Sequence, residues 1–291
     1  MKVYNLGSLN VDYVYSVDHF VSAGETISSD KMEIFPGGKG LNQSVAISRA
    51  GGCAVHGALC GSGADFLVEQ LSASGVDTSK IRRTAGSPGH AIIQVDRNGE
   101  NCIMLFAGTN RMLDEDYIKE FLFDAAAGDV LLAQNETNCL AEAFAVAKEK
   151  GMKIAFNPSP FDEKIASLPL DLVDIWFCNE IEGAALCGIS DPDGICESFR
   201  KKYPASSLVL TLGEEGSVFC DGKGTARQKA YPATPVDTTA AGDTFTGYFL
   251  ASHLSGKTPA ESMDTASRAS AVTVSRMGAS SSIPYIKELN L

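Results

Sequence analysis

The stretch "VDTTAAGDTFTG", residues 236–247, places small residues and then an acid where a helix is expected to begin. Unpaired backbone N–H groups at a helix start attract phosphate, and small side chains leave them uncovered. Asp243 would repel that phosphate unless it takes a proton from a nucleophile, and Asp237 would repel it unless a cation binds there. The stretch indicates an anion hole, a base and a cation site; the alternative is an N-capped helix with an acid in its first turn. The small residues of the anion hole are Ala240, Ala241 and Gly242.

The rest of the chain alternates short apolar runs with helical patterns, from "KVYNLG" near the start to "SLVLTLG" near residue 210. This alternation predicts an α/β fold in which helices cover both faces of a mostly parallel sheet. Such sheets bind ligands at the carboxyl ends of their strands. Within this pattern, residues 138–151 are expected to form a helix capped by Asn138.

One region breaks the alternation. Residues 89–108 predict a β-hairpin that turns at Asn98-Gly99. Residues 11–17 and 31–35 are also strand-like, with no helix between them. We therefore expect a single domain over residues 1–291, into which these three pieces insert a small β subdomain.

Composition limits the classes of function. The 291 residues carry a net charge of −12, which disfavours nonspecific binding to nucleic acid or anionic membranes. The N-terminus does not resemble a signal peptide, and the sequence has no apolar run of about 18 residues that would span a membrane. Eight scattered Cys without C-x-x-C spacing indicate reduced, mostly buried thiols in a cytoplasmic protein.

Two polar motifs near the N-terminus are candidates for binding a hydroxylated ligand. Asn10 and Asp12 are two apart on an extended segment, so both point to one side and can grip vicinal hydroxyls. A solvated strand face is the alternative. "FPGGKGLNQ" is not a P-loop, but its glycines let backbone approach a ligand; an ordinary turn before a helix is the alternative. Its candidate residues are Gly38, Lys39 and Asn42.

Further polar residues follow later strands. Glu136 comes just after "DVLLAQ". Asn179 and Glu182, after "DIWF", share a helix face where a carboxylate can hold a metal-bound water, or where both are simply capping residues. The loop "TLGEEG" either wraps a nucleotide or is a plain hairpin turn, and its candidate residues are Thr211, Gly213 and Gly216.

These motifs together resemble the ribokinase-like family of sugar kinases, also called the phosphofructokinase-B family. The resemblance covers essentially the whole chain and is most specific in "GGKGLNQSVAISRAGG" and "DTTAAGDTFTGYFLA". The order of "GSLNVD", "NET", "NEIE" and "TLGEEG" also fits, and "NVD" with "GGKGLNQ" is most similar to the ribokinases. Much of the family has Gly where this chain has Ala240, although some ribokinases share the Ala.

The resemblance implies a three-layer α/β/α sandwich with a small β-sheet lid. It implies ATP-dependent phosphorylation of a primary hydroxyl of a sugar, with D-ribose and its 5-phosphate as the first choice. Asp243 would be the base and residues 240–242 the anion hole. The sugar would bind Asn10, Asp12, Gly38, Lys39, Asn42, Glu136 and Asp243. The nucleotide would bind Asn179, Thr211, Gly213, Gly216, Gly242 and Ser267.

The resemblance also implies two metal ions and a partner. Glu182 would hold Mg²⁺ through water. A K⁺ ion would activate the enzyme, and the lid would form a homodimer contact. The K⁺ site would involve Asp237, Thr239, Thr273, Arg276, Gly278 and Ser282.

Other activities remain open at this point. The substrate can be another sugar, a sugar phosphate or a nucleoside, such as fructose, fructose phosphate or an adenosine-like compound. For a sugar phosphate, Arg82 and Arg83 are the conspicuous cationic pair near the lid. A non-catalytic sugar or nucleotide sensor would have lost the base, but Asp243 is present. A dehydrogenase and a hydrolase are disfavoured because neither G-x-G-x-x-G after an early strand nor G-x-S-x-G occurs.

Overall fold

The computed structural model describes residues 1–289, and a nine-stranded sheet forms its centre. The strand order is β13-β12-β11-β10-β9-β8-β1-β4-β5. All neighbours from β11 to β5 pair in parallel, whereas β12 and β13 pair antiparallel, so the predicted mostly parallel sheet is confirmed. The strands are β1 (Val3–Leu6), β4 (Ala54–Cys60), β5 (Ile81–Arg83), β8 (Val130–Gln134), β9 (Lys153–Asn157), β10 (Ile175–Asn179), β11 (Ser207–Thr211), β12 (Ser217–Asp221) and β13 (Gly224–Gln228).

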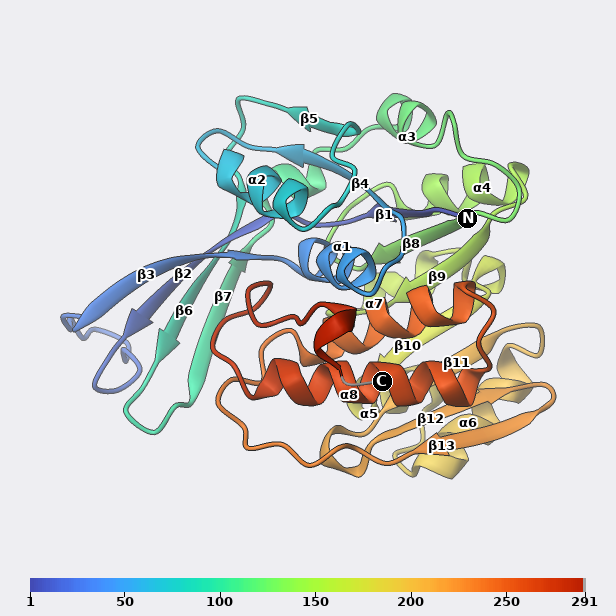
Figure 1. Ribbon diagram of the computed structural model, residues 1–291. Coiled ribbons are helices and arrows are strands. Elements are labelled where there is room, and N and C mark those ends of the chain that lie inside the picture. The colour runs from blue at the N-terminus through green and yellow to red at the C-terminus, as the bar shows by residue number, and fades with distance from the viewer. Residues whose placement is uncertain (290–291) are drawn as a thin grey trace.

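Helices cover both faces of this sheet, which confirms the predicted three layers (Figure 1). Each face of the sheet has its own apolar core, because the buried strands present hydrophobic side chains to both sides. One face carries α1 (Lys39–Arg49), α2 (Asp65–Ala73), α7 (Ala241–Leu254) and α8 (Pro259–Val274). The other face carries α3 (Glu115–Phe121), α4 (Leu140–Glu149), α5 (Glu180–Cys187) and α6 (Pro192–Lys202). Short 3₁₀ turns are η1 (Gly108–Arg111), η2 (Glu163–Ser167), η3 (Leu170–Leu172), η4 (Gly213–Glu215) and η5 (Ile286–Glu288).

A second, smaller sheet projects from the body beside the carboxyl ends of the parallel strands (Figure 1). Its order is β3-β2-β6-β7, with β3 (Lys31–Gly37), β2 (Asn10–Ser16), β6 (Gly89–Val95) and β7 (Asn101–Phe106). The expected hairpin is present as β6 and β7, and Gly99 in its turn has a φ of 81°. The central pair, β2 and β6, is parallel.

Two close helix contacts depend on glycine and bring the predicted motifs together. A Cβ atom on Gly40 would lie 2.3 Å from Cα of Gly7, so the start of α1 can press against the end of β1 only without a side chain. A Cβ atom on Gly247 would lie 2.4 Å from Cβ of Ala46, where α7 crosses α1. Helix α1 therefore packs closely against both β1 and α7, although the chain separates α1 and α7 widely.

The start of α4 differs from the expectation. Cys139, not Asn138, is the N-cap residue, with a φ of 56° and no side-chain cap. The Asn138 amide instead accepts a hydrogen bond from N–H of Leu113 at 3.1 Å and donates one to the Leu113 carbonyl at 2.8 Å. The cap prediction was wrong because this amide closes the preceding loop.

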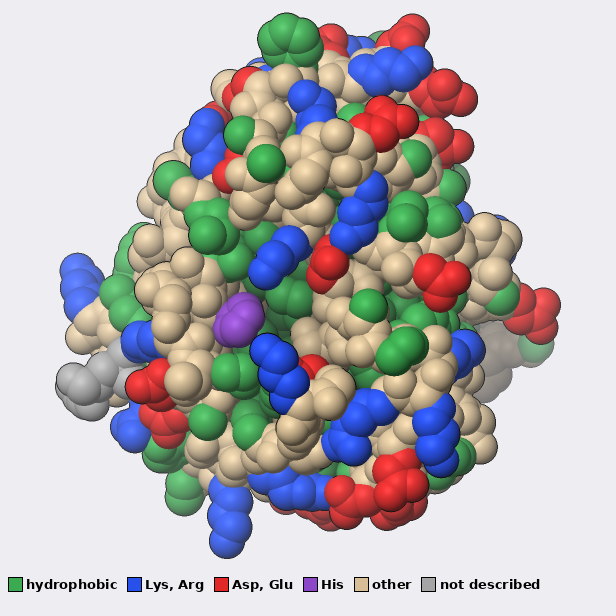
Figure 2. Space-filling view, turned by 90° about the vertical axis from the view of Figure 1, so that its right-hand side faces the viewer, with side chains coloured by type: hydrophobic (Ala, Val, Ile, Leu, Met, Phe, Trp, Pro, Cys, Tyr) green, Lys and Arg blue, Asp and Glu red, His purple; other side chains and the backbone are tan. Residues whose placement is uncertain are grey.

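The surface carries charges of both signs. Figure 2 shows acidic and basic side chains interspersed on the face where the parallel strands begin. Within residues 1–289, no helix is both long and apolar enough to cross a membrane.

The eight Cys are free thiols; Cys60, Cys178, Cys196 and Cys220 are buried, whereas Cys53 and Cys102 are exposed.

Candidate active site

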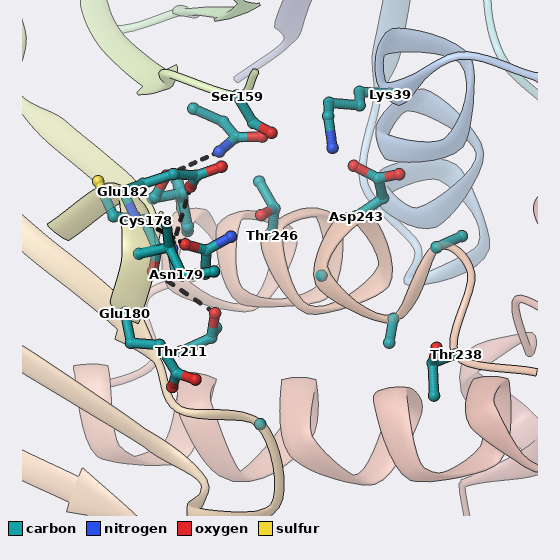
Figure 3. A pocket seen from close by; sticks show the side chains of 17 residues that line it. Lys39, Ser159, Cys178, Asn179, Glu180, Glu182, Thr211, Thr238, Asp243 and Thr246 are labelled. Carbon is teal, nitrogen blue, oxygen red and sulfur yellow. Dashed lines mark hydrogen bonds between the residues drawn. The ribbon is translucent and has the colours of Figure 1, made fainter. Parts of the chain in front are cut away.

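A pocket of about 420 Å³ opens where β9, β10 and β11 end and α7 begins (Figure 3). A second pocket of about 600 Å³ adjoins it and shares Thr211, Gly213, Ala241 and Gly242 with it. Among the residues predicted for the site, the first pocket is lined by Lys39, Asn179, Glu182, Thr211, Gly213, Ala240, Ala241, Gly242 and Asp243. The second adds Gly216 and Ser267.

The start of α7 faces this pocket with bare backbone. Ala240 precedes the helix in the left-handed region, with a φ of 61°, and no side chain caps the helix. The N–H of Ala241 points to the Thr238 carbonyl at 3.3 Å, whereas those of Gly242 and Asp243 have no acceptor within the described residues. A Cβ atom on Gly242 would meet nothing within 4 Å, so open space lies beside it. Free N–H donors at a helix start attract an anion.

Asp243 is buried in the first turn of α7, and its carboxylate is held from α1. Nδ2 of Asn42 donates to Oδ2 at 3.0 Å, and Nε2 of Gln43 donates to Oδ1 at 2.9 Å. Lys39 extends its ammonium group toward the carboxylate (Figure 3). Burial opposes the charge of Lys39, but the nearby carboxylates of Asp243, Glu136 and Glu182 raise its pKa above the ordinary value.

Glu136 lies behind the lysine, after β8. Its carboxylate accepts the backbone N–H of Lys39 at 2.9 Å and the hydroxyl of Ser8. Burial raises the pKa of Glu136, and the charge of Lys39 partly offsets that rise. The glycine loop, with Gly38 at a φ of 96° as N-cap of α1, thus places Lys39 between two acids.

Asn10 and Asp12 lie on β2 of the small sheet, outside the lining of both pockets. Burial, followed by the charge of Glu136, raises the pKa of Asp12 to about 7. Oδ1 of Asn10 accepts from Nδ2 of Asn110 at 2.7 Å, which leaves the Asn10 amide nitrogen to donate to a ligand. Sequence reasoning missed Asn110 because it lies in η1, 100 residues away.

Asn179 and Glu182 form a capping box at the start of α5. The Asn179 side chain accepts from the backbone of Glu182 at 2.8 Å, and the Glu182 carboxylate accepts from the backbone of Asn179 at 3.0 Å. The capping alternative is therefore realised. Both residues also line the pocket opposite Asp243 (Figure 3), so the cap fixes their positions there.

The "TLGEEG" loop is both a hairpin turn and a pocket wall. It joins the antiparallel strands β11 and β12 through η4. Gly216 has a φ of 103°, and a Cβ atom there would lie 2.0 Å from the carbonyl oxygen of Gln228. Thr211 and Gly213 line both pockets. Ser267 is buried on α8 at the far wall of the second pocket.

The residues predicted for a monovalent cation are brought together only in part. Asp237 accepts N–H groups from Thr239 and Gly278, each at 2.9 Å, and so joins the two segments. The side chains of Thr273, Arg276 and Ser282 each make a contact of their own. Thr273 bonds Thr244 at 3.0 Å, Arg276 bonds Glu288 at 2.8 Å, and Ser282 bonds the carbonyl of Ala279 at 2.7 Å.

Comparisons with known proteins identify the family of the chain. The family model described as pfkB family carbohydrate kinase matches residues 2–286. A ribokinase of Staphylococcus aureus is 34% identical over 99% of this chain and 98% of its own length. A ribokinase of Haemophilus influenzae is 35% identical over 97% of this chain and 95% of its own.

The solved structures give the same result. The structure of Arabidopsis thaliana ribokinase complexed with ribose and ATP superposes with a TM-score of 0.89 at 27% identity, covering 99% of this chain and 96% of that one. The family match spans both the large sheet and the smaller one. The chain therefore belongs to the pfkB family of carbohydrate kinases.

Proposed function

We propose that the protein transfers the terminal phosphoryl group of ATP to the primary hydroxyl of D-ribose, with Asp243 as the general base. The observation that carries the proposal is the position of Asp243, buried at the uncapped start of α7 and opposite Lys39. Its relatives in Staphylococcus aureus and Haemophilus influenzae are ribokinases, and the Arabidopsis thaliana ribokinase structure holds ribose and ATP.

Different residues of the site serve different parts of phosphoryl transfer. Asn10, Asp12, Gly38, Asn42 and Glu136 hold the sugar, so that its primary hydroxyl reaches Asp243. The proton of that hydroxyl moves to the Asp243 carboxylate as the hydroxyl oxygen bonds to the γ-phosphorus and the bond to the bridging oxygen of ADP breaks. The N–H groups at the start of α7, residues 240–242, and Lys39 stabilise the negative charge on the migrating group.

The residues that line the two pockets bind the nucleotide. Asn179, Thr211 and Gly242 lie beside the phosphates, whereas Gly213, Gly216 and Ser267 surround the nucleoside end. Support comes from the continuity of the two pockets, which gives one cleft running from Asp243 toward α8.

Two metal ions fit the donor sets. Mg²⁺ binds ATP phosphates and keeps most of its waters, so it needs few direct protein ligands. Glu182 would hold such a water, and the ion would neutralise phosphate charge. The segments that Asp237 joins offer only oxygen ligands, which suits K⁺; they include Thr239, Thr273, Arg276, Gly278 and Ser282.

The acids around the sugar favour an uncharged substrate over a sugar phosphate. Arg82 and Arg83 lie on β5, at the edge of the large sheet, and pair with Glu120 at 2.7 Å and Asp65 at 2.6 Å. These cations are therefore engaged away from the sugar site, while Asp12 and Glu136 would repel a second phosphate. Fructose and nucleosides remain as competing neutral substrates.

The smaller sheet acts as a lid of a single kinase domain and forms a homodimer contact. Leu105 occupies the same cross-strand row as Ala91 and Asp12, so it lies on the sugar-facing side of the sheet. Ile103 and Leu105 are 52% and 53% exposed. An apolar sheet face of this kind is a typical protein contact surface.

The test is a steady-state assay of ADP release with ribose, fructose, fructose 6-phosphate and adenosine. The proposal expects the highest kcat/KM with ribose and a product phosphorylated at the 5-hydroxyl, identified by phosphorus NMR. A higher kcat/KM for fructose or adenosine would show that this compound, and not ribose, is the preferred substrate. ADP release with no sugar dependence would overturn the proposed reaction itself.

A further inference from the structure

Beneath the pocket lies a chain of buried amides that none of the assigned roles uses. It is built from Asn5 on β1, Gln134 on β8, Asn157 on β9 and Gln43 on α1. All four are buried, and Asn5, Gln43 and Gln134 are fully inaccessible. The three strands are neighbours in the sheet, so the amides form one continuous layer under the active site. Buried amides are costly unless they are hydrogen-bonded, which calls for a reason for this concentration.

The hydrogen bonds of this amide layer end on the carboxylate of Asp243. Nε2 of Gln43 donates to Oδ1 of Asp243 at 2.9 Å and to Oδ1 of Asn157 at 3.1 Å. Oε1 of Gln43 accepts from Nε2 of Gln134 at 2.7 Å. Nε2 of Gln134 also donates to Oδ1 of Asn5 at 3.0 Å.

Two backbone carbonyls decide which way every amide points. Nδ2 of Asn5 donates to the Gly40 carbonyl at 2.8 Å, so its oxygen must face Gln134. Nδ2 of Asn157 donates to the Phe177 carbonyl at 2.8 Å, so its oxygen must face Gln43. A carbonyl can only accept, and each amide has one accepting and one donating end. The orientation therefore propagates from both anchors, and the N–H end of Gln43 is directed at Asp243.

We propose that Gln43 is a positioning residue for the base: the amide layer fixes the Gln43 side chain, which in turn fixes the Asp243 carboxylate for proton abstraction. This role rests on the proposed function of Asp243. A reversed Gln43 would place its oxygen against the carboxylate and against the oxygen of Asn157. The layer excludes that arrangement before the substrate arrives, as preorganised catalytic groups require.

The main test is Gln43→Glu, which preserves size but replaces the donor by a second acid beside Asp243. The charged groups that already face this carboxylate are Lys39 from α1 and Glu136 after β8, and Glu182 from α5 in turn faces Lys39. We expect kcat to fall about 10–100-fold with KM for ribose and ATP within about threefold. We also expect the acid limb of the kcat profile to move up by about one pH unit, because a neighbouring acid disfavours a second negative charge.

A second variant, Gln134→Glu, does not touch Asp243 but sets an acceptor against the Gln43 oxygen. It should lower kcat in the same direction, again with little change in KM. The matched control is Asn138→Asp, which alters an amide bonded only to Leu113 and Cys139. The control should leave the pH profile unmoved. Thermal melting of all three variants separates loss of fold from loss of positioning.

A readout that does not depend on turnover separates this inference from the proposed reaction. The ¹³C resonance of the Asp243 carboxyl should be displaced in Gln43→Glu relative to the unaltered protein, because the N–H that Gln43 donates to it is lost. If the protein fails to phosphorylate ribose but this displacement occurs, the reaction is wrong and the positioning contact stands. An unmoved resonance and an unmoved pH profile in a folded Gln43→Glu protein would overturn the inference.

Discussion

The side chain of Asn42 donates a hydrogen bond to the carboxylate of Asp243 at 3.0 Å, although 201 positions separate them in the chain. This bond joins the two most specific motifs of the sequence. It exists because α1 and α7 cross at Gly247, where a side chain would clash with Ala46. Helices α1 and α7 thus form one unit.

The unusual environment of Asp12 predicts a pH-dependent stability. Its pKa rises from an ordinary 3.8 to about 7 in the folded protein, chiefly through burial. Between these values the folded state keeps a proton that the unfolded state has released. The free energy of unfolding therefore falls as pH rises from about 4 to 7. Asp12→Asn should remove this loss, adding about 1–3 kcal/mol at pH 8, while weakening ribose binding.

Urea denaturation of both proteins at pH 5 and pH 8 measures this effect. Asp116→Asn is the control, because the Asp116 side chain is 95% exposed. If the unaltered protein and Asp12→Asn lose the same stability between the two pH values, the raised pKa of Asp12 is wrong.

The left-handed backbone of Ala240 predicts a stabilising substitution. A φ of 61° is unfavourable for alanine by about 1–2 kcal/mol but not for glycine. After the larger unfolded-state entropy of glycine is subtracted, Ala240→Gly should gain about 0.5–1 kcal/mol and keep its activity. In Ala260→Gly, on the exposed first turn of α8, the same change should cost up to about 1 kcal/mol. Equal destabilisation of the two variants in thermal melts would contradict the strain at Ala240.

The contact between Asp237 and Gly278 predicts activation by a monovalent cation. Asp237 lies just before α7 in the chain, and these segments offer oxygen ligands, so K⁺ should raise the rate several-fold over Na⁺ at equal ionic strength. Asp237→Asn should abolish the difference between the salts. Identical rates in KCl and NaCl for the unaltered protein would remove the proposed cation site.

The apolar lid face predicts a dimer. Sedimentation equilibrium should give twice the mass of the 30.7 kDa chain, and Leu105→Glu should give the monomer. The control is Phe123→Glu on the body, because Phe123 is 78% exposed and lies outside the lid. A monomeric unaltered protein, or a dimer that survives Leu105→Glu but not Phe123→Glu, would exclude the lid as the interface.

The sequence predicted much of this architecture because its signals are local. Alternating apolar runs predicted the parallel sheet, and Asn98-Gly99 predicted the hairpin. Small residues before Asp243 indicated the uncapped start of α7, and the spacing of Asn179 and Glu182 already allowed for a capping box.

The contacts that the sequence could not predict are long-range. Asn110 orients Asn10 from 100 residues away, and Gln134 orients Gln43 from 91. Asn110 lies in no motif, and Gln134 only ends the apolar run "DVLLAQ", where nothing in the sequence marks it as a partner of Gln43. The parallel pairing of β2 with β6 could not be predicted either, because the sequence of neither strand indicates with which distant strand, or in which register, it pairs.

The central claim is that Asp243 removes the proton from the sugar hydroxyl. The most direct measurement is kcat for ribose phosphorylation by Asp243→Asn, combined with calorimetric titration of ribose and ATP. The account predicts that both ligands still bind and that kcat falls about 10²–10⁴-fold, the range for a positioned base. A folded variant with near-normal kcat would contradict it.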